Sequence, residues 1–135
     1  MPMLGTAIQN MTKILVIDPE LEVRQLMIQI LGPDEQWQVL ETADPEGAVK
    51  IAREHRDLDW ILVDGDFHGN NKRSKMEELV RSLRLDCPQA KLIAMAHRVE
   101  WNDLLVQAGC VYKIHKHPCS AANWFMALMG ILIRY

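Results

Sequence analysis

Short, continuous apolar runs alternate along this chain with segments of helical periodicity, and this alternation restricts the fold more than any other feature. Three of the runs are Lys13–Ile17, Trp60–Val63 and Leu92–Ala96. A continuous apolar run is typical of a strand that is buried on both faces of a parallel sheet. Residues 37–43 and 110–115 predict two further strands.

The intervening segments predict helices. Val23, Leu26, Met27 and Ile30 recur at helical spacing, and Gly32-Pro33 ends that segment. A second helix is expected to open at Asp44, as its N-cap, with a proline in its first turn. Three more helices are expected near residues 74–85, 100–107 and 120–133. Strands and helices in strict alternation predict an α/β domain with a parallel sheet and helices on both of its faces.

Length and composition indicate one globular domain. The chain has 135 residues, 49% of them hydrophobic, and we expect residues 1–12 to form a flexible leader and residues 13–135 the domain. A net charge of −3 without a basic run argues against direct nucleic-acid binding. The apolar run 124–133 is about half the length of a membrane span, so we expect no membrane partner. An odd number of cysteines and no visible signal peptide favour free thiols in a reducing cytoplasm.

Candidate functional residues follow the strands. Asp18 follows the first predicted strand and Asp64 the third, Ala96 ends the fourth, and Lys116 follows the fifth. Sites in open parallel sheets lie beyond the carboxyl ends of the strands. These positions are therefore expected to meet at one edge of the sheet.

Three stretches resemble the receiver domain of two-component response regulators. They are the first strand with its acidic turn, Lys13–Arg24; the strand that ends in an acid, Asp59–Asp64; and Ala108-Gly109, seven residues before Lys116. The resemblance implies a flavodoxin-like doubly wound sheet of five parallel strands in the order 2-1-3-4-5. It also implies a signalling module whose partner is a histidine kinase or another signalling protein.

The same resemblance implies roles for individual residues. Asp64 stands at the position that accepts a phosphoryl group, and Lys116 at the position that contacts it. Asp18, Asp64 and the backbone carbonyl of Asp66 would hold Mg²⁺. A carboxylate that attacks a phosphate meets like-charge repulsion, which a divalent cation and an ammonium group relieve.

Several positions depart from the family pattern. Pro19 replaces the second acid of the magnesium-binding pair, so Mg²⁺ is expected to bind weakly. Ala96 stands where a switching Ser or Thr belongs, and Lys113 (or Tyr112, if the alignment slips by one residue) where the switch aromatic belongs. His117 replaces the proline that usually follows the lysine, and the loop after the third strand is about four residues longer than usual. This combination resembles atypical receivers, or pseudo-receivers.

Several readings of these residues stay open. Asp18 is also suited to cap the first helix, Lys116 to be a solvated loop lysine, and His97 to be an ordinary surface histidine. Glu20 or Asp66 offers a substitute for the missing acid.

Three functions compete. The leading one is a degenerate receiver that acts through protein contacts. The second is a working receiver that is phosphorylated on Asp64 by a histidine kinase with Mg²⁺ and is at most a weak self-phosphorylating enzyme. The third is a flavodoxin-like ligand binder, which is disfavoured because no loop is suited to cradle a flavin phosphate.

The last predicted helix suggests an interaction surface. Its apolar residues form two adjacent stripes, but Met126 and Ile133 fall on a further face that the sheet does not cover. Exposed apolar residues of this kind mark interfaces. We therefore expect a homodimer, or docking of a partner, through this helix without phosphorylation.

Overall fold

The strands form one parallel sheet. In the computed structural model, which describes residues 11–65, 72–116 and 121–133, five strands pair in parallel in the order β2-β1-β3-β4-β5. The predicted flavodoxin-like fold and strand order are confirmed. The strands are β1 (Thr12–Ile17), β2 (Trp37–Thr42), β3 (Trp60–Val63), β4 (Lys91–Ala96) and β5 (Tyr112–His115).

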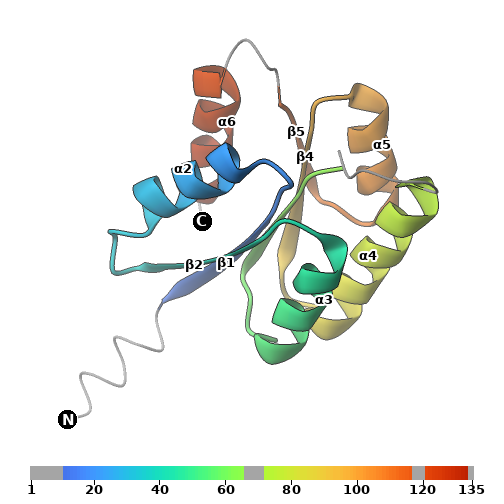
Figure 1. Ribbon diagram of the computed structural model, residues 1–135, viewed down its shortest axis with the longest axis horizontal. Helices are drawn as coiled ribbons and strands as arrows, with labels where there is room; N and C mark the ends of the chain where they lie inside the picture. Colours follow the sequence, from blue (N-terminus) through green and yellow to red (C-terminus); the bar gives the residue numbers. More distant parts are fainter. Residues whose placement is uncertain (1–10, 66–71, 117–120, 134–135) are drawn as a thin grey trace.

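Helices cover both faces of this sheet (Figure 1). On one face lie α2 and α6, and on the other lie α3, α4 and α5. No helix in the described ranges has both the length and the apolarity needed to cross a membrane. Their bounds are α2 (Leu21–Leu31), α3 (Pro45–Glu54), α4 (Lys72–Asp86), α5 (Val99–Ala108) and α6 (Ala121–Ile133).

The burial of β1 explains its continuous apolar sequence. Its last four side chains are all completely buried. Leu15 and Ile17 pack in the core beneath α3, α4 and α5, whereas Ile14 and Val16 pack beneath α2 and α6. Successive side chains of a strand point to opposite faces, so the part of β1 that helices cover on both faces has no polar residue.

Some boundaries differ from the predicted ones. β1 begins at Thr12, one residue inside the predicted leader, and β5 begins at Tyr112, two residues later than predicted. The delay follows from the end of α5, where Gly109 has a φ of 139° and Cys110 still donates its N–H to Leu105. The first ten residues of the leader, the loop 66–71 and residues 117–120 lie outside the described residues, and with them Asp66 and His117.

The start of α3 is as predicted. Asp44 is its N-cap and accepts the N–H of Gly47 at 2.7 Å, and Pro45 lies in the first turn. The corresponding prediction for Asp18 is wrong. Glu20, not Asp18, occupies the N-cap position of α2, and its side chain makes no capping hydrogen bond.

Candidate functional site

Three strands bring Asp18, Asp64 and Lys116 together. These residues directly follow the end of β1, β3 and β5. The Nζ atom of Lys116 lies 2.7 Å from Oδ2 of Asp18 and 2.7 Å from Oδ2 of Asp64. The prediction that the three residues cluster at one edge of the sheet is confirmed, and the reading of Lys116 as a solvated loop lysine is wrong.

All three charged groups of this cluster are buried. Asp18 is 0% exposed, Asp64 1% and Lys116 1%. Burial raises the pKa of Asp18, although the nearby ammonium of Lys116 opposes that rise. Burial by itself would lower the pKa of Lys116, but the negative charges of Asp64 and Asp18 outweigh it and the pKa is raised. Lys116 is therefore charged at neutral pH, and each buried carboxylate depends on it for compensation.

A third carboxylate, from Glu20, joins the cluster. Its Oε1 atom lies 3.2 Å from Nζ of Lys116. One oxygen from each of Asp18, Glu20 and Asp64 lies within 4.8 Å of the others. Carboxylate oxygens are the ligands that Mg²⁺ prefers, and the side chain of Glu20, 41% exposed, leaves the cluster open to metal-bound water. The chemistry of these three donors fits a magnesium ion, and Glu20 places a carboxylate beside the two aspartates although Pro19 offers none.

Hydrogen bonds in the β1–α2 turn direct Glu20 toward the cluster. The N–H of Glu20 donates to Oδ1 of Asp18 at 2.8 Å. The guanidinium of Arg24 donates to the backbone carbonyl of Asp18 at 2.7 Å and forms an ion pair with Glu41 on β2. These contacts tie the turn to α2 and α2 to β2, and the carboxylate of Glu20 faces Asp64 and Lys116, which follow β3 and β5.

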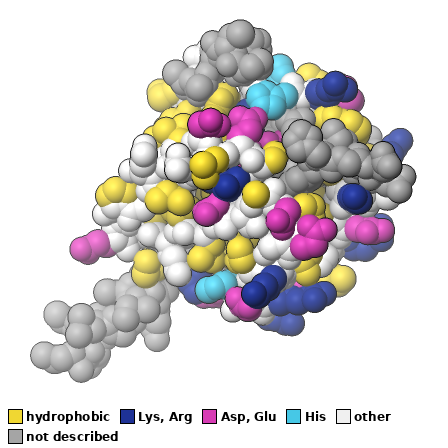
Figure 2. All heavy atoms as spheres, viewed as in Figure 1, with side chains coloured by type: hydrophobic (Ala, Val, Ile, Leu, Met, Phe, Trp, Pro, Cys, Tyr) yellow, Lys and Arg dark blue, Asp and Glu magenta, His cyan; other side chains and the backbone are white. Residues whose placement is uncertain are grey.

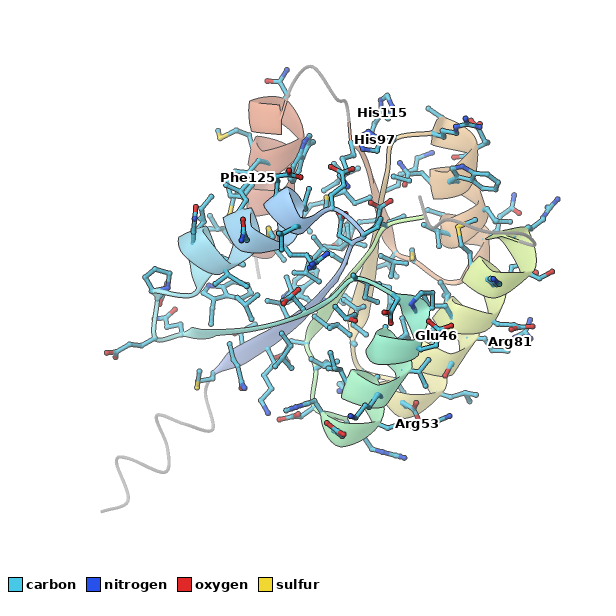
Figure 3. The ribbon with its side chains drawn as sticks, in the orientation of Figure 1. Glu46, Arg53, Arg81, His97, His115 and Phe125 are labelled. Carbon is cyan, nitrogen blue, oxygen red and sulfur yellow. The ribbon has the colours of Figure 1, made fainter. Side chains whose placement is uncertain are left out.

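His97 borders the cluster; from the sequence, a role at the mouth of the site and an ordinary surface position were both open for it, with the surface position favoured. Its Nε2 atom lies 2.8 Å from Oε1 of Glu20, and Nε2 of His115 lies 2.7 Å from the backbone oxygen of His97. Figure 3 shows the two histidines close together where β4 and β5 end. Partial burial acts to raise the pKa of Glu20, but the hydrogen bond with His97 and the charge of Lys116 outweigh it, so the pKa is lowered.

Asn102 fixes the position of Ala96. Ala96 is fully buried, and its N–H donates to Oδ1 of Asn102 at 2.9 Å. Nδ2 of Asn102 donates to the backbone oxygen of Ile114 at 2.9 Å. This side chain, only 3% exposed, joins α5 to the ends of β4 and β5. Asn102 is not among the site residues predicted from the sequence, although a polar residue three positions before buried Leu105 was the available signal.

The two candidates for the switch-aromatic position lie in different surroundings. Lys113 forms an exposed ion pair with Asp103 of α5 at 3.1 Å. The ring of Tyr112 packs near Trp60 of β3, with a centroid separation of 6.3 Å. The aromatic ring on β5 therefore contacts the residue that begins β3, whereas Asp64 follows the other end of that strand.

Comparison with known proteins finds similarity in structure alone. No protein-family model matches the chain, and no curated protein matches it significantly. A Burkholderia pseudomallei response regulator, solved with a phosphorylated aspartic acid, a calcium ion and citrate, is similar over 87% of this chain and 66% of its own (18% identity, TM-score 0.67). This chain therefore spans about two thirds of that protein.

Two other solved structures are similar to this chain over most of their own length. The chemotaxis protein CheY4 of Vibrio cholerae matches over 88% of this chain and 97% of its own (16% identity, TM-score 0.67). The response regulator TrrA of Thermotoga maritima, solved with Mg²⁺ and BeF, matches over 87% and 97% (21% identity, TM-score 0.65). The chain therefore has the fold of response-regulator receiver domains.

Proposed function

We propose that this chain is a receiver module of cytoplasmic two-component signalling that has lost part of its phosphorylation machinery and acts through protein contacts. One observation carries this proposal. The triad of charged residues Asp18, Asp64 and Lys116 is complete, whereas Ala96, at the position of the switching residue, is held in place. Lys116 bridges Asp18 and Asp64, whereas Ala96 has no hydroxyl and its N–H is bound by Asn102. A phosphoryl group on the triad would have no strand-four side chain to draw toward it.

The residues of the triad have distinct roles in this proposal. Asp64 is the phosphoacceptor position, and Lys116 would hold the anion that forms there. Asp18, Glu20 and Asp64 would hold Mg²⁺, with the backbone carbonyl of Asp66 as a further ligand. When bound, the metal would spread the negative charge of the site. Because Lys116 already occupies the Oδ2 atoms of both aspartates, it competes with the metal for them.

A second candidate is a working receiver that a histidine kinase phosphorylates on Asp64. One observation favours it, namely the carboxylate of Glu20 within the cluster. The two candidates differ in the strength of Mg²⁺ binding and in whether Asp64 acquires a phosphoryl group that alters the rest of the fold.

Restoring the missing acid is expected to strengthen metal binding. We predict that Pro19→Asp lowers the Mg²⁺ dissociation constant about tenfold, because it adds a hard oxygen ligand beside Asp18. Titration followed by tryptophan fluorescence or calorimetry measures this. The matched control is Pro45→Asp, which makes the same change in the same Asp-Pro-Glu sequence at the start of α3. Equal affinities of wild type and Pro19→Asp would refute the alignment of the β1–α2 turn.

The same titration distinguishes the two candidates through Glu20→Gln. If Glu20 replaces the missing acid, this variant binds Mg²⁺ more weakly than the wild type. If the wild type binds no Mg²⁺ at millimolar concentrations and acetyl phosphate leaves no phosphoryl group on Asp64, the working-receiver candidate is excluded.

We further propose that the module dimerises through α6. Met126 and Ile133 are 70% and 76% exposed, whereas Trp124, Leu128 and Leu132 of the same helix are buried against the sheet. We predict that sedimentation of the unphosphorylated protein shows a dimer that the double variant Met126→Glu, Ile133→Glu dissociates. Leu85→Glu, at a 75% exposed position on the opposite face, is the control. A wild type that stays monomeric at high concentration would rule out the dimer.

A further inference from the structure

A groove of about 590 Å³ runs between α4 and α5. On α4 it is lined by Glu77, Arg81, Arg84 and Leu85, which the helical spacing places on one stripe, and on α5 by residues that include Leu104. The volume is within the range of protein ligand pockets. None of the three residues of the triad lines the groove.

The apolar part of the groove includes an exposed leucine. Leu104, 8% exposed, contributes to the lining from α5, and Pro88 lines it just beyond the end of α4. Leu85 is 75% exposed at the edge. An apolar group of a partner that bound in the groove would bury this exposed side chain, and the removal of apolar surface from water is favourable.

The positive charges of this groove come from arginines that form no ion pair with an acidic residue among the residues that the structure describes. Glu77 forms an ion pair with Arg73, one turn away on α4, at 3.5 Å. Within the described part of the chain, Arg81 forms no ion pair. Figure 3 shows it projecting outward from α4, and Figure 2 shows Lys and Arg side chains gathered over the side of the molecule where α3 and α4 lie.

Arg84 is held in place across the end of α5. Its Nη1 atom donates to the backbone oxygen of Ala108 at 3.3 Å. The side chain lies against Gly109, where an added Cβ would be 2.5 Å from Cδ of Arg84 and where φ is 139°. Glycine therefore gives the arginine room. The guanidinium also stabilises the carboxyl end of a helix, and it keeps further N–H donors free.

We propose that this groove binds an acidic segment of a partner protein that carries an aliphatic side chain. The carboxylates of the segment would pair with Arg81 and Arg84, since guanidinium groups match carboxylates with two parallel hydrogen bonds. Its aliphatic side chain would cover Leu85 and Leu104. Two arginines on a chain of net charge −3 are too few to hold a nucleic acid or an anionic membrane, so charge complementarity favours an acidic protein.

A peptide titration tests the proposal on the full chain. The probe is a synthetic peptide of alternating glutamate and leucine, and the comparison peptide has lysine in place of glutamate. We expect the acidic peptide to shift the amide resonances of residues 81–85 and 104–108. It should also change tryptophan fluorescence, because Trp101 lines the adjoining hollow between the same helices.

Charge variants connect that binding to the arginines. We expect Arg81→Glu to raise the peptide dissociation constant at least about fivefold. Lys50→Glu, the same charge reversal at an exposed position on α3, should leave it unchanged. Because Arg84 also holds the end of α5, its test is the milder Arg84→Lys, which should weaken binding with unchanged thermal stability.

Three results would overturn the proposal. They are no resonance shift with the acidic peptide at millimolar concentration, equal binding of the lysine peptide, or binding of free citrate at the same residues with the affinity of the peptide. The last would assign the groove to small carboxylates. None of these outcomes depends on whether Asp64 is phosphorylated.

Discussion

Replacing Lys116 with methionine is expected to lower the free energy of unfolding by about 3–5 kcal/mol near neutral pH. The substitution removes the ammonium that lies 2.7 Å from both Asp18 and Asp64 and leaves two buried carboxylates side by side. Urea unfolding of the variant and the wild type measures the loss. Lys113→Met is the control, because Lys113 pairs with Asp103 at the surface and should cost less than about 1 kcal/mol.

The pH dependence of this loss identifies its cause. Without Lys116, burial and mutual repulsion would raise the pKa of a carboxyl of the pair in the folded variant above its value in the unfolded chain. A group of this kind destabilises the fold above its folded pKa, and the penalty disappears as the pH falls below its unfolded pKa. The difference between Lys116→Met and wild type should therefore shrink at acidic pH. A difference that stays constant with pH would indicate lost packing instead of unpaired charge.

Replacing Asn102 with alanine is expected to cost about 2–4 kcal/mol of stability. The change leaves the N–H of Ala96 and the backbone oxygen of Ile114 without their side-chain partner in a buried region. We also expect faster hydrogen exchange at the amide of Ala96. Asp103→Ala, at the adjacent exposed position, should be nearly neutral. If Asn102→Ala is as stable as the wild type, Asn102 does not anchor α5 to the ends of β4 and β5.

The fold was predictable because local patterns and burial agree. β1 and β3 are apolar at successive positions since helices cover both of their faces, and α3 has both its capping aspartate and its proline. The alternation of these elements predicted the parallel sheet, and the family resemblance predicted its strand order. The meeting of Asp18, Asp64 and Lys116 then followed from the strand ends.

The remaining contacts of the site depend on how turns and helices are placed in space. Glu20 reaches Lys116 and His97 only because the turn after β1 is held by hydrogen bonds to Asp18. Asn102 bonds to two strands that are six and twelve residues away in sequence. The sequence offers Glu20 as a substitute acid and marks Asn102 as a polar residue near a buried position, but the contacts themselves depend on the exact position of each side chain relative to distant atoms.

The most direct test of the degenerate-receiver proposal compares amide spectra with and without beryllofluoride and Mg²⁺. We predict that any changes stay near Asp18, Asp64 and Lys116, and that β5 around Lys113 and the whole of α5 keep their resonances, because Ala96 cannot follow a phosphoryl group and Asn102 holds α5 to the sheet. Asp64→Asn, which removes the acceptor carboxylate, is the control for specific binding. Large, Asp64-dependent shifts through β5 and α5 would contradict the proposal and show that the module still switches.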